Sequence, residues 1–262
     1  MRDVTPSRHE TGARSAASRL LAALLLCGGL LLTGAAPAGA ATLNWADPAV
    51  VWPNGSLGPH TFTLSNGVMV TITVAATAGG SFTFSSPAED CASGCVNSPQ
   101  LFGSAHNLGV VFDPTAGGAS TVNVTLSFST PVTDLMFEIS DIDFSVGAAG
   151  THRRDQVVIT SNAGNPALSF KTVGTHTFSI AGNTATANCT VSPEPNCNPA
   201  TDTTAAPSDA GTVVVDFTGL SVSTVTIAYN EAGSGTNPSG RGIGLLANLS
   251  LTPVELMNFT IE

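Results

Sequence analysis

The fold class is decided by an alternating stretch, Leu135–Phe144, which reads LMFEISDIDF. Successive side chains of a β-strand point to opposite faces. Leu135, Phe137 and Ile139 therefore share one face, which we expect to be buried. Similar alternating runs recur after residue 40 with turn residues between them, and almost no run has the helical period. This pattern is typical of a sandwich or barrel, so the sequence predicts an all-β fold.

The strongest hairpin signal is Ser65-Asn66-Gly67, because Asn-Gly between two alternating runs favours a tight turn. Roughly a dozen short strands are predicted, and we expect them to form a jelly-roll-like antiparallel β-sandwich with two long loops pinned by disulfides. The predicted strands are Leu43 to Trp52, Thr61 to Leu64, Val68 to Val74, Ser81 to Ser85, Leu108 to Phe112, Thr121 to Ser129, Val132 to Ser140, Asp155 to Thr160, Ala167 to Lys171, His176 to Ile180, Thr212 to Phe217, Ser223 to Tyr229 and Ile243 to Leu251.

The first 40 residues have the three parts of a signal peptide. Arginines precede an apolar run, Leu20 to Leu32, and Pro37-Ala38-Gly39-Ala40 supplies the small residues of an A-x-A cleavage site. The run is shorter than the roughly 20 apolar residues of a membrane span. We expect cleavage after Ala40, a β-sandwich domain over 41–252, and a tail or final strand over 253–262. The product is then secreted or at the cell surface, without membrane insertion after signal cleavage.

The chain that remains after cleavage is strongly acidic. The whole sequence has 18 Asp and Glu against 8 Lys and Arg. Cleavage removes Asp3 and Glu10 together with half of the bases, so the excess of acids grows. Such a surface repels nucleic acid and anionic lipid. It is compatible with divalent cations or with neutral partners such as glycans, and it keeps an exported protein soluble.

The cysteines agree with export, because an even number remains after the leader is removed. We expect the pairs Cys91–Cys95 and Cys189–Cys197. Each pair lies in one predicted loop, Ser86 to His106 or Ala185 to Ala210, so the disulfides would pin loops. A zinc site with four thiolates is the alternative, although the spacings differ from the usual ribbon pattern.

Three aspartates are the candidate metal ligands. If the alternation of Leu135–Ile139 continues, Asp141 and Asp143 lie on the buried face, where unpaired carboxylates are costly. Ca²⁺ binds roughly six to eight oxygens, often from aspartates, and Asp155 could add a third carboxylate. Two alternatives stay open: a clamp by Arg153, Arg154 or backbone amides, and a bulge at Ser140 that turns Ile142 inward and the aspartates outward.

Aromatic and catalytic signals are sparse. Trp45 and Trp52 lie seven apart in a predicted strand, so they face opposite sides if the strand is regular, with one in the core and one able to face a ligand. No G-x-S-x-G or H-E-x-x-H motif occurs. The histidines after the leader are scattered near loops.

A succession of short motifs resembles a known group of proteins. Phe137–Asp143 reads FEISDID, and it is followed by Arg154-Asp155-Gln156-Val157 and later by Gly242-Ile243-Gly244-Leu245. This order resembles β-sandwich modules of bacterial secreted and cell-surface proteins of adhesin type, with a D-I-D strand end and a G-I-G closing strand. Pro253-Val254-Glu255-Leu256 is similar to the linker after such modules. The resemblance covers most of Trp45 to Phe259 and implies a structural surface module without an assigned activity.

These observations together predict a secreted, non-enzymatic surface or adhesion-type module, with Ca²⁺ at the three aspartates as the stabilising cofactor. The expected partners are glycans or other surface proteins, and neither nucleic acid nor a membrane. A carbohydrate-binding module is the first alternative, favoured by an exposed Trp beside Asn or Asp. A secreted hydrolase is the second, and it requires a pocket that holds two acids or a His with a Ser.

Overall fold

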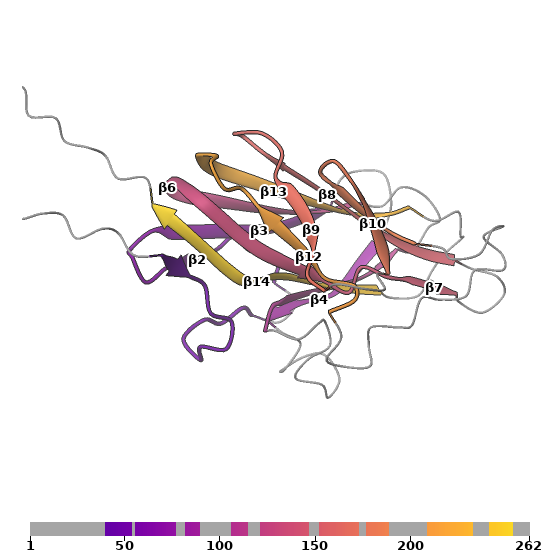
Figure 1. Cartoon of the computed structure of the whole chain (residues 1–262). Helices are drawn as coiled ribbons and strands as arrows, with labels where there is room; N and C mark the ends of the chain where they lie inside the picture. Colours follow the sequence, from indigo (N-terminus) through magenta and orange to yellow (C-terminus); the bar gives the residue numbers. More distant parts are fainter. Residues whose placement is uncertain are drawn as a thin grey trace, which may run out of the picture. The chain divides into compact units, whose positions relative to one another are not determined.

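The computed structural model describes most of the chain after residue 39, and every regular element that it describes is a β-strand. The strands pair in antiparallel fashion throughout the described part, in one strongly curled sheet to which β7 adds a short separate pair (Figure 1). The all-β, antiparallel prediction is therefore confirmed. The described residues are 40–53, 56–76, 82–89, 106–114, 121–146, 152–172, 177–188, 209–232 and 241–253.

The strands have the following bounds: β1 Ala41–Thr42, β2 His60–Thr63, β3 Met69–Ala76, β4 Phe82–Glu89, β5 Leu108–Pro114, β6 Thr121–Ser140, β7 Phe144–Val146, β8 His152–Ser161, β9 Ala167–Phe170, β10 Phe178–Ala181, β11 Thr184–Ala187, β12 Val213–Asp216, β13 Val222–Glu231 and β14 Arg241–Pro253.

The organising element is β6, which the sequence predicted as two strands. Its first half pairs with β3 on one side and β13 on the other, whereas its second half pairs with β12 and β14. From β13 the sheet continues to β8, β11 and β10, and from β14 it continues to β5 and β4. One long strand is therefore shared by two groups of neighbours, and the sheet curls between them.

A backbone irregularity at Asp134 separates the two halves of β6. In the first half the even-numbered side chains, from Val122 to Phe128, are buried. In the second half the odd-numbered ones, from Leu135 to Ile139, are buried instead. Asp134 has a φ of 51°, a left-handed conformation that shifts the alternation by one residue. This shift keeps both halves facing the same hydrophobic core.

The predicted hairpin at Ser65-Asn66-Gly67 is confirmed. It joins β2 to β3, with Phe62 opposite Val70. Gly67 has a φ of 84°, which a residue with a side chain adopts only with strain. The Asn66 side chain accepts a hydrogen bond from the Val68 amide at 3.1 Å, and this contact fixes the turn.

The predicted strand from Leu43 to Trp52 is wrong over its whole length. β1 ends at Thr42, and turns follow. The Asp47 side chain accepts a hydrogen bond from the Ala49 amide at 2.9 Å, and its backbone amide donates to the Asn44 carbonyl at 3.0 Å. Asp and Asn side chains compete in this way with strand pairing.

The two predicted loops are shorter than expected at their starts. β4 extends to Glu89 and β11 to Ala187, so residues 86–89 and 185–187 belong to paired strands. The four cysteines of the predicted pairs, Cys91, Cys95, Cys189 and Cys197, lie outside the described residues, as do residues 1–39 of the predicted signal peptide and the tail after Pro253. The disulfide predictions therefore remain predictions.

Candidate functional site

Of the three predicted aspartates, Asp143 and Asp155 contact each other, and Asp141 lies two residues before Asp143 in the segment between β6 and β7. Asp141 has a φ of 69° and is 7 % exposed. The turn at this residue directs Ile142 into the core, where its amide donates to the Gly211 carbonyl at 3.0 Å. The continued alternation that we expected is therefore wrong, because Ile142 takes the inward position. The predicted bulge is right about Ile142, but it wrongly places Asp141 in water.

Asp155 is the best-defined member of this group, which we call the aspartate corner. Its side chain is buried, and the residue is 4 % exposed. The Tyr229 hydroxyl donates to one carboxylate oxygen at 2.6 Å, and the Asp143 amide donates to the other at 3.3 Å. The Asp155 amide in turn donates to the Asp143 carbonyl at 3.1 Å. Hydrogen bonds from neutral donors thus offset the cost of burying this carboxylate.

The carboxylate of Asp155 in the aspartate corner is held by hydrogen bonds from protein groups. Within the ranges that the structure describes, no group of three or more His, Cys, Asp or Glu is placed to hold a metal ion. Both oxygens of Asp155 accept hydrogen bonds from protein groups. The Asp143 amide, which donates to Asp155, is a backbone clamp of the kind that we predicted as an alternative. The Arg154 side chain donates from Nε to the Ala187 carbonyl at 2.8 Å.

Both tryptophans are core residues. Trp45 is 4 % exposed and Trp52 is 2 % exposed, and each packs against Phe62, with ring centroids 5.6 Å and 6.3 Å apart. The expectation that one indole lies on an exposed face does not hold, because it assumed a regular strand from Leu43 to Trp52. The Trp45 indole nitrogen donates to the Leu246 carbonyl at 3.0 Å, so it is held in place.

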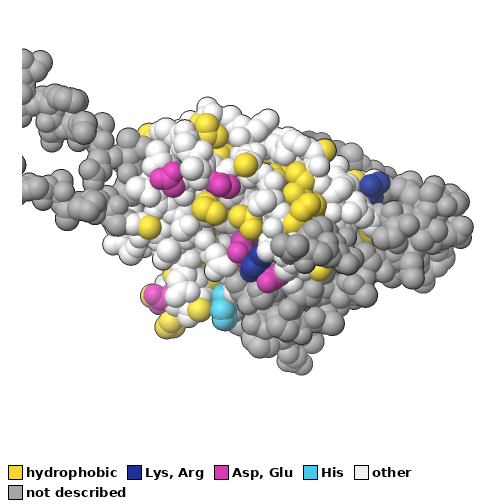
Figure 2. Space-filling view, in the orientation of Figure 1, with side chains coloured by type: hydrophobic (Ala, Val, Ile, Leu, Met, Phe, Trp, Pro, Cys, Tyr) yellow, Lys and Arg dark blue, Asp and Glu magenta, His cyan; other side chains and the backbone are white. Residues whose placement is uncertain are grey.

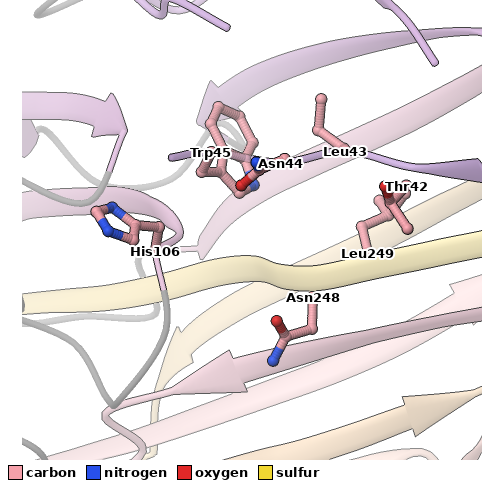
Figure 3. Close-up of a pocket in the computed structure, with 7 residues that line it drawn as sticks. All are labelled: Thr42, Leu43, Asn44, Trp45, His106, Asn248 and Leu249. Carbon is pink, nitrogen blue, oxygen red and sulfur yellow. The ribbon is translucent and has the colours of Figure 1, made fainter. Parts of the chain in front are cut away.

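Trp45 nevertheless contributes to the wall of a pocket of about 430 Å³. Figure 3 shows its residues coming from the segment at and after β1, from β14 and from just before β5. Asn248 in this wall has a φ of 53°, and Leu246 beside it has a φ of 62°. The strand is irregular here, and its register shifts against β6. The lining residues are Thr42, Leu43, Asn44, Trp45, His106, Asn248 and Leu249.

A Ser–His contact joins the segment before β2 to the first residue of that strand. Ser56 Oγ and His60 Nε2 are 2.6 Å apart, and the Gly58 amide donates to the same hydroxyl at 3.2 Å. The Trp52 indole nitrogen donates to the Ser56 carbonyl at 2.9 Å, and its ring lies 4.5 Å from that of His60. These contacts fasten a tight turn to the core. Sequence reasoning treated His60 as isolated, because a spacing of four outside a helix carries no signal.

One polar surface of the described strands was not predicted. Uncharged side chains cover the outward face of the strands around the first half of β6, and the strand register aligns them in rows. We call this surface the hydroxyl face. Its rows are Thr61, Thr71, Ser127 and Thr224; Thr73, Thr125, Thr226 and Thr160; Ala75, Asn123, Ala228 and Val158; and Thr121, Asn230, Gln156 and Thr186.

Every residue of the hydroxyl face is at least partly exposed, and none is charged. The side chains that alternate with them, such as Ile72, Val124 and Ile227, are buried. The face is therefore the solvent side of the sheet. In the view of Figure 2, charged side chains are few, and they lie apart from one another except for one group of a basic side chain with acidic ones.

One row of the hydroxyl face is joined by side-chain hydrogen bonds. The Thr121 hydroxyl donates to the Asn230 carbonyl oxygen at 2.5 Å, and the Asn230 amide donates to Gln156 at 3.5 Å. The Gln156 amide donates to the Thr186 hydroxyl at 3.0 Å. The row crosses β6, β13, β8 and β11, and each bond polarises the next. The amide groups are thus held in fixed orientations.

A second polar cluster joins the end of β9 to the second half of β6. Lys171 Nζ lies 2.8 Å from Glu138 and 3.2 Å from Asp209. Partial burial lowers the pKa of Lys171, but hydrogen bonds to Glu138 and Asp209 and their negative charges raise it by more, so the pKa lies above its ordinary value of 10.5. The cluster stabilises the fold and keeps the ammonium group charged.

No known protein family matches this chain, and neither the curated proteins nor the solved structures give a significant match. Among the described residues, no helix is long and apolar enough to cross a membrane.

Proposed function

We propose that this chain is a secreted, non-enzymatic surface module of adhesion type, and that it contacts its partner through the hydroxyl face. The observation that carries the proposal is the absence of charge from this face in a chain with a net charge of −10. An uncharged surface can approach a neutral glycan or protein surface without electrostatic repulsion. The resemblance to adhesin-type modules and the signal peptide agree with this role.

The proposal includes a finer account of the fold. The two halves of β6 have different neighbours, and this supports a jelly-roll-like sandwich in which β6 passes from one layer to the other. The disulfides Cys91–Cys95 and Cys189–Cys197 would pin the loops next to β4 and β11. Peptide mapping of the exported protein without reduction tests these pairs, and cross-linked peptides that join the two loops would contradict them.

A substitution in the centre of the hydroxyl face tests the function. Thr226→Glu adds one negative charge there, and Ser250→Glu adds the same charge at an outward position of β14 as a matched control. Residues 41–262 are immobilised on beads and washed over surfaces coated with neutral polysaccharide, with protein or with anionic lipid. We expect beads with the native chain or with Ser250→Glu to be retained on a neutral polysaccharide or a protein surface, and beads with Thr226→Glu not to be retained. Equal retention of both variants, or none for the native chain, contradicts the proposal.

We propose that Ca²⁺ binds at the aspartate corner in addition to the hydrogen bond that Tyr229 donates to Asp155. An ion at the aspartate corner would have to draw on Asp141 and Asp143 together with oxygens from elsewhere. Binding to the folded state raises the melting temperature by mass action. A rise on adding Ca²⁺ after EDTA, lost in Asp141→Ala/Asp143→Ala, supports the ion. An unchanged melting temperature shows that the clamp at Asp155 suffices without it.

The pocket beside Trp45 favours a second candidate, a carbohydrate-binding module. Its wall combines Asn and His side chains with apolar ones, and its volume of about 430 Å³ lies within the range of small-molecule sites. We expect a soluble oligosaccharide to bind more weakly after Asn248→Ala. Asn248→Gly is the matched variant, because it also removes the amide and in addition suits the positive φ. Binding unchanged in both variants excludes the pocket.

A further inference from the structure

We propose that the ligand of the hydroxyl face is a neutral polysaccharide, bound as an extended chain or at an ordered surface. This inference rests on the proposed adhesion function and names its partner. It concerns a different surface from the Trp45 pocket, and it involves no aromatic platform, because both tryptophans are buried.

Charge selects a neutral ligand. The chain has 18 Asp and Glu against 8 Lys and Arg, so its overall field repels polyanions. A polyanion also needs cationic partners, and the rows of the hydroxyl face contain only Thr, Ser, Asn, Gln, Ala and Val. A polycation would be drawn to the acidic parts of the surface instead. A neutral polymer is therefore the class of ligand that this uncharged face binds most favourably.

The spacing of the rows suits a polymer with repeated hydroxyl groups. Neighbouring strands lie about 4.8 Å apart, and alternate residues along a strand recur about every 6.7 Å. Thr73, Thr125, Thr226 and Thr160 therefore repeat a hydroxyl from strand to strand. One such contact alone contributes little to affinity, because it replaces a hydrogen bond to water. A repeating ligand gains affinity by making several contacts at once.

The face also offers the apolar contacts that sugar rings need. The row that lies between two polar rows contains Ala75, Ala228 and Val158, all partly exposed. Threonine methyl groups add to this surface. A sugar ring presents C–H groups on its faces and hydroxyls at its edge, so a polar row beside an apolar row matches both parts of the ring.

The hydrogen-bonded row provides fixed polar groups. Asn230 and Gln156 are held by their neighbours, and the Thr186 hydroxyl accepts from Gln156 and keeps its own proton for donation. Side chains that are ordered before binding lose less conformational entropy when a ligand arrives. We therefore expect this row to determine the orientation and the register of the bound sugar chain.

The test measures adsorption of residues 41–262 to microcrystalline cellulose and to chitin, with alginate gel as the anionic comparison. We expect binding to at least one neutral polymer and none to alginate. Asn230→Ala/Gln156→Ala should raise the dissociation constant about tenfold or more. Ser169→Ala/Ser250→Ala, at outward positions of β9 and β14, should leave it unchanged. Thermal melts confirm that each variant is folded.

Several outcomes overturn the inference. They are adsorption to neither neutral polymer, equal adsorption of both double variants, or a loss only in Asn248→Ala, which assigns the sugar to the Trp45 pocket. Retention on a protein-coated surface alone, lost in Thr226→Glu, keeps the adhesion function and rejects polysaccharide as its ligand.

Discussion

At the scale of single residues, the buried polar groups explain how an acidic chain tolerates carboxylates inside its sheet. Asp155 accepts hydrogen bonds from the Tyr229 hydroxyl and the Asp143 amide, and Lys171 lies between Glu138 and Asp209. The sequence indicated that Asp155 and its neighbours needed partners. It did not identify Tyr229, which is 74 residues away in the chain and meets Asp155 only through the pairing of β8 with β13.

Tyr229→Phe should destabilise the protein. It keeps the buried ring but removes a hydroxyl that donates to Asp155 at 2.6 Å. A buried acceptor that loses a donor costs about 1–3 kcal/mol. Urea unfolding measures the change in the free energy of unfolding. The control is a double-mutant cycle with Asp155→Asn and Tyr229→Phe/Asp155→Asn. If the effect of the double mutant equals the sum of the two single effects, the two side chains do not interact.

The ion pairs of Lys171 predict a stability change at alkaline pH. The folded-state pKa of Lys171 is raised above 10.5. Its contribution is therefore fully present below the unfolded-state pKa and is lost as the pH rises through the folded-state pKa. Lys171→Met removes this contribution, so the difference in melting temperature between native protein and variant should shrink from about pH 9 to about pH 12. A difference that stays constant or grows over this interval contradicts the ion-pair account.

At the scale of elements, β6 determines how the sheet is arranged, and Asp134 determines how β6 serves two sets of neighbours. The sequence predicted two separate strands, Thr121 to Ser129 and Val132 to Ser140. The structure makes them one strand, β6, with the change of alternation at Asp134. Alternation reveals which residues face the core, but it does not reveal that two consecutive strands are continuous or which strands pair with them.

Asp134→Val should destabilise the sheet, whereas Asp134→Gly should not. At a φ of 51°, a β-branched side chain is strained by about 1–2 kcal/mol, and glycine is not strained. Chemical denaturation of the two variants measures the difference directly. If Val and Gly are equally stable, the left-handed conformation at Asp134 does not control the change of face in β6.

At the scale of the whole molecule, the sequence predicted the all-β class and the acidic surface, because both follow from local pattern and composition. The hydroxyl face could not be predicted. Threonines such as Thr73, Thr125 and Thr226 are far apart in the sequence, and only the register of β3, β6 and β13 makes them neighbours. The Trp45 prediction failed for a related reason, since Asn44 and Asp47 form turns where alternation suggested a strand.

The most direct test of the central claim is a map of where a neutral sugar chain touches the protein. Isotope-labelled residues 41–262 are titrated with soluble oligosaccharides of cellulose and chitin, and backbone amide shifts are followed by NMR. The account predicts shifts at Thr73, Thr125, Thr226 and Asn230 on β3, β6 and β13. Shifts confined to Trp45, His106 and Asn248, or no shifts at any concentration, would contradict a binding role for the hydroxyl face.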